Sequence, residues 1–338
     1  MKKVLIFLCK LIISGIISIG ILSVFTYFYK YTGVHIKNGS KATDYKWEPN
    51  QVMSTMVEGF ARFKMDKNGF NNAICKDENP DILVMGSSHM EAAQMQPDEN
   101  VAYLLNMGLP NYYTYNIGTS GHTIYNCVKN IKNAVDVYKP NKYIIIETSL
   151  VDLNVNDMKK VINDTYPTIQ SYDSGILYEI QRTIPAVKEL YKSVDDWREV
   201  GKNNNESKKN TQDKYNEEYV EVLNQFISKA SQPINQENIE LIIVYHPGTF
   251  VDKDGVFQEQ KNLKAIETFE NACNENGVKF INMTSDFKKL YENEKILAHG
   301  FSNTSVGSGH LNKYGHKEIA NRLIDYIKKN EEDSNGSK

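Results

Sequence analysis

The sequence predicts an α/β protein: a three-layer α/β/α sandwich around a parallel sheet of five strands, preceded by an N-terminal transmembrane helix. Three observations lead to this prediction. An apolar stretch opens the chain, short apolar runs recur from residue 80 onward, and segments with helical periodicity separate those runs. Runs that are apolar without alternation suit strands covered on both faces, which is typical of parallel sheets flanked by helices.

The opening segment, residues 1–30, is interpreted as a membrane anchor. Residues 11–29 carry no charge and are long enough to cross a hydrocarbon core of roughly 30 Å. Lysines precede this stretch, so the positive-inside rule places the N-terminus in the cytoplasm and the rest of the chain outside the cell membrane. A cleaved signal peptide is the alternative, but we find no small-x-small cleavage site, and the aromatic end of the stretch resembles an interfacial anchor.

The remainder of the chain divides into three segments. Residues 31–79 are mixed and polar without a strong period, and we interpret them as a stalk and a lead-in segment that packs against the next domain. Residues 80–330 carry the alternation of apolar runs and helical segments, and they are expected to form one domain. We expect residues 331–338 to form a disordered tail.

Strands and helices alternate within residues 80–330. Two segments, 123–139 and 312–329, place apolar residues at helical spacing. Such alternation implies right-handed crossovers between parallel strands. Five apolar runs are predicted as the strands: residues 82–85, 113–118, 143–149, 239–246 and 278–283.

Residues 155–216 form an insertion in this pattern. Its first part contains a possible amphipathic helix over residues 174–197, which Pro185 would kink or restart. A polar stretch that we expect to be mobile follows it. Such an insertion either caps a site or faces a membrane partner, or it is a surface excursion without a role.

Composition excludes several classes of protein. The net charge is −3 and the lysines are mixed with acidic residues, so the chain lacks the basic field that nucleic-acid binding needs. The four cysteines are scattered, and no pair has the Cys-x-x-Cys spacing of zinc or redox sites. The sequence therefore predicts neither a metal site nor a redox centre.

The first predicted strand ends in Gly86-Ser87-Ser88. Ligands bind at the carboxyl ends of the strands in open parallel sheets, and Gly86 permits a tight turn there. A serine at this turn can attack a carbonyl while its own N–H stabilises the resulting oxyanion. A helix-capping role is the alternative for a lone Gly-Ser-Ser.

Two further motifs support a catalytic interpretation. His310 ends a glycine-rich loop just before the last helix, with Asn312 as its expected N-cap. A loop histidine at this edge of the sheet is well placed to act as a base for the serine. Between them in the chain, residues 116–121 form a strand end whose glycines offer a backbone N–H.

Together these motifs resemble blocks one, two and five of the SGNH, or GDSL, hydrolase superfamily, in the same chain order. The resemblance spans about residues 80 to 330 and implies the flavodoxin-like sheet of that superfamily. Ser87 stands where most members have aspartate. This variant, together with the anchor and the insertion, resembles membrane-anchored acyl-transfer proteins of the cell envelope, such as those that transfer D-alanine to teichoic acids.

The resemblance implies a role for each matched residue. Ser88 is expected to be the nucleophile, His310 the general base, and the N–H groups of Ser88 and Gly121 the oxyanion donors. His89 is expected to line the pocket. The chemistry implied is transfer through an acyl-enzyme, in which a sugar hydroxyl or water accepts the acyl group, and it needs no metal or cofactor.

The sequence departs from the family at two further positions. Gly307 replaces the aspartate three residues before His310, so another group must orient the histidine: a backbone carbonyl, Ser305, or an acid from elsewhere such as Asp286. Val151 replaces the block-three asparagine, which leaves three substitute donors. Loss of one oxyanion donor can cost about 10²- to 10³-fold in rate. The substitute donors are Ser149, Asp152 and Asn154.

Four other polar residues are candidates for the site or its surroundings. His246 follows the fourth strand and either contacts substrate or has no role there. His122, beside Gly121, is a candidate for the pocket edge, whereas His316 within the last helix is expected to be structural or exposed. Glu147 lies in an apolar strand, where a buried carboxylate needs a partner, and it is expected to brace the site.

These features favour a membrane-anchored, extracytoplasmic SGNH-like serine acyltransferase or esterase. Its expected substrates are acetyl or D-alanyl groups of a cell-envelope polysaccharide or teichoic acid, and family analogy suggests a membrane-bound O-acyltransferase as partner. The alternative is a catalytically degenerate SGNH domain that serves as a polysaccharide-binding or assembly subunit. A secreted lipase or arylesterase is a third reading.

Overall fold

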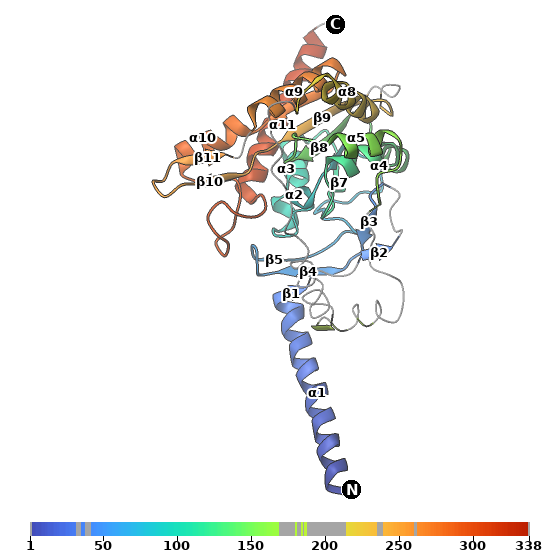
Figure 1. The fold of residues 1–338 in the computed structure, drawn as a ribbon, viewed down its shortest axis with the longest axis vertical. Coiled ribbons are helices and arrows are strands. Elements are labelled where there is room, and N and C mark those ends of the chain that lie inside the picture. The colour runs from blue at the N-terminus through green and yellow to red at the C-terminus, as the bar shows by residue number, and fades with distance from the viewer. Residues whose placement is uncertain are drawn as a thin grey trace.

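A five-stranded parallel sheet forms the centre of the protein in a computed structural model (Figure 1). The structure describes residues 2–31, 35–37, 42–168, 214–234, 239–259 and 262–336, with residues 180, 184, 186 and 187. The sheet order is β12-β9-β8-β6-β7, and all neighbours are parallel. The predicted fold class is confirmed. The strands are β6 (Ile82–Met85), β7 (Thr114–Asn116), β8 (Tyr143–Thr148), β9 (Glu240–Tyr245) and β12 (Lys279–Asn282).

The strand order is flavodoxin-like, and it fixes where a ligand can bind. The chain runs from β6 to β7 on one side and then crosses to β8 on the other. The order of the strands therefore reverses between β6 and β8, and in open α/β sheets the binding crevice lies at the carboxyl ends of the strands at such a point. Register places Met85 opposite Ile146, so Ser87 and Ser88 follow β6 close to the end of β8.

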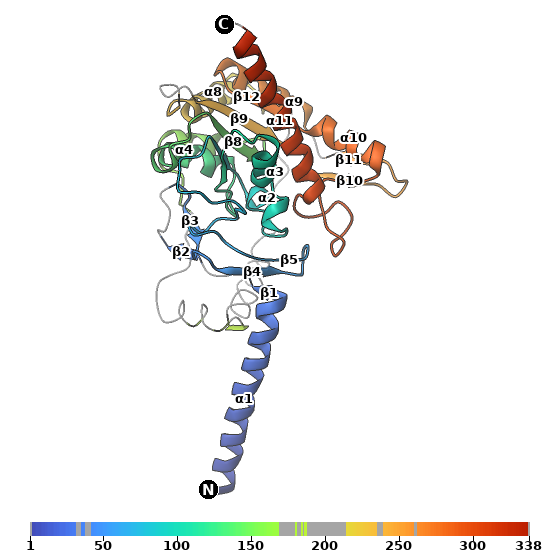
Figure 2. The ribbon, with the colours of Figure 1, turned by 180° about the vertical axis from the view of Figure 1, so that it is seen from behind.

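Helices cover both faces of the sheet, as Figures 1 and 2 show. Successive side chains of a strand point to opposite faces, and in β8 Ile144 and Ile146 join one apolar cluster while Ile145 joins the other. One face packs on α3 (Val101–Gly108), α10 (Thr284–Glu294) and α11 (Lys313–Gly336), and the other on α4 (Ile124–Tyr138), α5 (Val155–Ile162), α8 (Glu217–Ser231) and α9 (Leu263–Glu275).

An apolar helix, α1 (Lys2–Tyr29), projects from the folded part of the chain (Figure 1). None of its residues is buried, and its most apolar window has a mean hydropathy of 2.6. By length and composition it is able to cross a bilayer, a property that N-terminal signal sequences share.

The segment after α1, interpreted from the sequence as a stalk and a lead-in segment, forms short sheets in its described residues. These sheets enclose a small apolar cluster around Trp47, Met53 and Phe63, and they lie between the carboxyl edge of the central sheet and α1 (Figures 1 and 2). Strands of two to four residues leave no readable period in the sequence, which is why the segment reads as irregular. β1 (Lys30–Tyr31) pairs with β4 (Val52–Thr55), β4 with β5 (Ala61–Lys64), and β2 (His35–Lys37) with β3 (Tyr45–Trp47).

Other boundaries differ from expectation. Helix α11 continues to Gly336, so residues 331–336 of the predicted tail are helical. Within the insertion, α5 and α8 occupy the two ends, while the possible helix over residues 174–197 and the polar stretch after it lie almost wholly outside the described residues. The sequence did not indicate a hairpin that follows β9, formed by β10 (Thr249–Val251) and β11 (Phe257–Glu259).

Candidate active site

The structure brings Ser88 and His310 together. Ser88 is the first residue of a short helix, α2 (Ser88–Glu91), directly after β6, and its Oγ lies 2.8 Å from Nε2 of His310. Gly86 makes this turn possible, because a Cβ there would lie 2.6 Å from Oε2 of Glu147. Asn312 caps α11 as expected: its side-chain oxygen accepts the N–H groups of Tyr314 and Gly315, which fixes the loop end that carries His310.

The acid that orients His310 is Glu58, which the sequence did not indicate. One oxygen of Glu58 lies 2.8 Å from Nδ1 of His310, and the other accepts the backbone N–H of His310 at 2.6 Å. Partial burial acts to raise the pKa of Glu58, but the hydrogen bonds from His310 outweigh it and hold that pKa below its ordinary value. The carboxylate therefore stays ionised opposite the imidazole.

Steric crowding explains why position 307 carries no aspartate. Gly307, at the position where the family has aspartate, has φ +70°, and a Cβ there would lie 2.7 Å from the carbonyl oxygen of Thr249. A side chain is excluded at this position by the backbone of β10. Of the other candidates, Asp286 lies in the first turn of α10 and Ser305 is exposed in the loop. The alternative of an acid from elsewhere in the chain is the one observed, with Glu58 in place of Asp286.

The loop that precedes His310 in the chain holds the turn that carries Glu58. Asn303 accepts the N–H of Gly59 at 2.9 Å and donates to the carbonyl oxygens of Met56 and Gly59. Gly59 itself has φ +71°, and a Cβ there would lie 2.2 Å from the carbonyl oxygen of Gln94. The turn between β4 and β5 is therefore fixed against both the His310 loop and the chain after α2.

Ser88 and Gly121, whose N–H groups are the expected oxyanion donors, lie in the turns that follow β6 and β7. The N–H of Thr119 donates to the carbonyl of Gly86 at 3.1 Å, so the loop that ends at Gly121 lies beside the serine turn. Gly121 has φ +77°. Within the described part of the chain, neither the N–H of Ser88 nor that of Gly121 has an acceptor among the hydrogen bonds that we observe.

The three proposed substitutes for the missing asparagine lie differently. Asp152 binds Lys214 and the hydroxyl of Tyr215, and Asn154 caps α5. Ser149 is exposed just beyond β8. Asp152 and Asn154 are therefore engaged in other contacts, whereas Ser149 lies at the edge of the sheet.

A buried hydrogen-bonded chain lies behind the serine turn. One oxygen of Glu147 accepts both the N–H and the hydroxyl of Ser87, at 2.8 and 2.9 Å, and the other lies 2.8 Å from Nε2 of His246. The series of hydrogen bonds continues from His246 to His299, with Nδ1 of His246 3.3 Å from Nε2 of His299. Burial acts to raise the pKa of Glu147, but these hydrogen bonds and the nearby histidines outweigh it and lower the pKa to about 2.

This chain explains why Ser87 replaces the aspartate of block one. A carboxylate at position 87 would stand against the carboxylate of Glu147, and two like charges at such a distance repel. The hydroxyl of Ser87 instead donates to Glu147 and accepts the N–H of His89 at 3.2 Å. Glu147 is expected to brace the site, and it directly contacts Ser87, the residue before Ser88.

The other histidines are placed as follows. His89 lies against His310, with ring centroids 5.1 Å apart, and its Nδ1 accepts the N–H of Leu311; burial lowers its pKa to about 3. His246 is fully buried and His122 is nearly so, beside Asp44, so neither lines an open pocket. His316 is buried and structural, and it accepts the N–H of Val101.

Residues that could hold a metal are not gathered at the site. In the described ranges, no group of three or more histidine, cysteine, aspartate or glutamate side chains surrounds a common point suited to a metal ion. Cys75, Cys127 and Cys273 are free thiols.

Comparison with models of known families finds no match, and comparison with curated proteins finds none. Similar solved structures include a lipolytic protein of the G-D-S-L family from Veillonella parvula, with 14% identity and a TM-score of 0.38 over 72% of this chain and 96% of that one. The acetyl xylan esterase AlAXEase has 13% identity and a TM-score of 0.41, covering 73% and 99%. The esterase EstA from Pseudoalteromonas sp. has 14% identity and a TM-score of 0.37, over 73% of this chain and 96% of that one.

At these identities and TM-scores, the likeness does not carry an activity to this chain. The observed sheet order is the one that the SGNH resemblance of the motifs implies. In this chain a flavodoxin-like sheet carries a serine, a histidine and a glutamate that are joined by hydrogen bonds at its switch point.

Proposed function

We propose that the protein is a serine esterase or acyltransferase that forms an acyl-enzyme on Ser88. The observation that carries this proposal is the continuous chain from Ser88 to His310 to Glu58, with both side-chain distances at 2.8 Å. A serine hydroxyl is a weak nucleophile until a base accepts its proton, and this arrangement supplies the base together with a group that orients it.

Each residue has a step in the reaction. His310 Nε2 accepts the proton of Ser88 as Oγ forms a bond to the ester carbonyl, and the N–H groups of Ser88 and Gly121 stabilise the oxyanion. The protonated imidazole, stabilised by the Glu58 carboxylate, returns the proton to the departing alkoxide. Water or a sugar hydroxyl then attacks the acyl-enzyme while His310 accepts its proton, and the imidazolium returns that proton to Oγ of Ser88 as the acyl group leaves.

We further propose that α1 anchors the domain in the cell membrane, with the N-terminus cytoplasmic and the site outside. Contacts at the end of α1 support an anchor over a cleaved signal peptide. Arg62 donates to the carbonyl of Tyr27 at 2.9 Å, and its guanidinium lies 4.5 and 4.7 Å from the ring centroids of Tyr27 and Phe28. Cleavage after the helix would remove these contacts.

We base the proposed substrate and partner on the family resemblance and on the proposed membrane location. A site tethered to a membrane suits acyl groups, acetyl or D-alanyl, on a cell-envelope polysaccharide or teichoic acid. A membrane-bound O-acyltransferase that delivers acyl groups across the bilayer is the partner that we propose. The alternative, a catalytically degenerate subunit, rests on the missing aspartate and asparagine. Glu58 supplies the carboxylate that the missing aspartate would otherwise provide.

The test is labelling of the full-length protein in detergent with a fluorophosphonate, followed by mass spectrometry of the adduct. We expect a single adduct on Ser88 that is lost in Ser88→Ala and in His310→Ala. Ser305→Ala is the matched control, because Ser305 is an exposed serine of the His310 loop. A folded wild-type protein without an adduct would contradict the enzyme and favour the binding subunit.

A further inference from the structure

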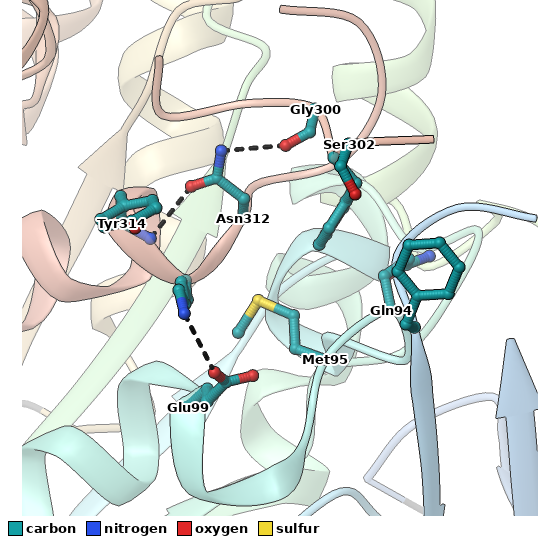
Figure 3. A pocket seen from close by; sticks show the side chains of 10 residues that line it. Gln94, Met95, Glu99, Gly300, Ser302, Asn312 and Tyr314 are labelled. Carbon is teal, nitrogen blue, oxygen red and sulfur yellow. Dashed lines mark hydrogen bonds and ion pairs between the residues drawn. The ribbon is translucent and has the colours of Figure 1, made fainter. Parts of the chain in front are cut away.

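Figure 3 shows a pocket with a volume of about 330 Å³. It is built by the same segments that carry the catalytic residues: the turn after Glu58, the loop and helix start around His310, and the chain that follows α2. Its lining has an aromatic part and a polar part. The lining includes Phe60, Gln94, Glu99, Gly300, Lys313 and Tyr314.

The pocket adjoins the catalytic residues without containing them. Phe60 is two residues from Glu58, a separation that the chain spans in at most about 7 Å. Gly300, in the pocket wall, donates its N–H to the carbonyl of His310 at 2.9 Å. Neither Ser88 nor His310 lines the pocket. A ligand here is therefore a part of the substrate remote from the ester that reacts.

The aromatic part of the lining suits a flat ligand with C–H groups on its faces. Phe60 is 62% exposed and Tyr314 is 39% exposed. Exposed aromatic faces beside a pocket attract ligands that cover them, and the negative face of a ring attracts the weakly positive C–H groups of a sugar.

The polar part of the lining favours a neutral, hydroxyl-bearing ligand. Among the described residues, Oε1 of Gln94 is buried and has no hydrogen-bond donor. Lys313 and Glu99 lie 3.8 Å apart across the wall and together carry no net charge (Figure 3). A phosphate would have to bind beside Glu99, whereas sugar hydroxyls both donate and accept and can serve the amide, the ammonium and the carboxylate alike.

We propose that this pocket is a subsite for a neutral sugar unit of the acylated polymer. The inference rests on the proposed function and narrows its substrate to a neutral polysaccharide rather than a polymer with a phosphate backbone. Binding a remote sugar here holds the acyl ester at Ser88, and such remote contacts raise catalytic efficiency for the polymer over a small ester.

The experiment measures binding of short neutral oligosaccharides, built from glucose, xylose or N-acetylglucosamine, to full-length Ser88→Ala protein by calorimetry. We expect binding by at least one of them, weakened roughly tenfold by Phe60→Ala or Tyr314→Ala. Gln94→Leu, which removes the amide and keeps the size, is expected to weaken it as well. Phe250→Ala is the control, since Phe250 is an aromatic residue on β10 that is 41% exposed and outside the pocket.

The outcomes separate this inference from the proposed function. Failure of every neutral oligosaccharide to bind, or equal binding by Phe60→Ala and Phe250→Ala, overturns the subsite while fluorophosphonate labelling of the wild type still supports the enzyme. Stronger binding by glycerol phosphate oligomers than by the sugars also overturns it. Sugar binding without labelling overturns the enzyme and retains the subsite.

Discussion

Glu58 and His310 lie 252 positions apart in the sequence and are joined by two hydrogen bonds, one to the ring and one to the backbone of the histidine. The acid of the proposed triad thus comes from the N-terminal segment and not from the loop that carries the histidine. Because β1 continues directly from α1 and pairs with β4, the same small sheet that presents Glu58 also receives the end of the apolar helix.

Replacing Glu58 by glutamine should lower the rate of ester hydrolysis by about 10²- to 10⁴-fold, because the amide neither stabilises the imidazolium nor enforces the tautomer that leaves Nε2 free. The rate is measured with 4-nitrophenyl acetate and by fluorophosphonate labelling. Glu78→Gln, at an exposed glutamate of the same segment, is the control. A wild-type rate in Glu58→Gln would show that another group orients His310.

Arg62→Ala should slow the labelling of Ser88 several-fold in the full-length protein in lipid nanodiscs. Arg62 also donates to Ser54 of β4 at 2.5 Å, so it joins the end of α1 to both strands of the hairpin that carries Glu58. Lys64→Ala, at an exposed position two residues further along β5, serves as the control. Equal rates in the two variants would mean that the position of Glu58 does not depend on this contact.

Gly307→Ala should destabilise the fold more than Gly255→Ala. Both glycines have positive φ, at +70° and +75°, so the backbone strain is similar. A Cβ at Gly307 would lie 2.7 Å from the carbonyl of Thr249, whereas nothing lies within 4 Å at Gly255. We expect a difference of about 1–3 kcal/mol in the free energy of unfolding, read from urea titrations. Similar losses would remove the steric explanation for the missing aspartate.

Stability should fall as the pH is lowered below about 6.5. Burial lowers the pKa of His316 to about 3 and that of His299 to about 2, well below the value of 6.5 for free histidine. The unfolded chain then binds protons that the native chain does not, so stability is lost as the pH falls from 6.5 toward those values. Unfolding midpoints from pH 7.5 to 4.5 measure the slope, and His316→Gln is expected to reduce it. An unchanged slope would assign the acid sensitivity to other groups.

The buried carboxylate of Glu147 adds a second, more acidic component. Its pKa of about 2 lies below the ordinary value of 4.5, so its contribution is complete above pH 4.5 and is lost as the pH falls through 2. Glu147→Gln should therefore flatten the profile only below about pH 4.5. This separates its effect from that of the histidines, which begins near neutrality.

Local patterns in the sequence determined the central sheet. The apolar runs predicted all five parallel strands to within two residues at either end, and the Gly-Ser-Ser and His310 motifs predicted which strand end and loop would meet. These features are readable because periodicity and turn residues act within a few positions along the chain. The apolar helix at the N-terminus is equally local.

Only the tertiary structure decided what completes the site. Glu58 lies in a short turn with no motif, His246 is buried against Glu147 rather than open to substrate, and His299 joins that chain from a loop with no signal. Gly307 looked like a lost catalytic residue, yet its lack of a side chain follows from its contact with β10. Such pairings depend on contacts between distant segments, and a carboxylate can serve a histidine from any part of the chain that brings it within about 3 Å.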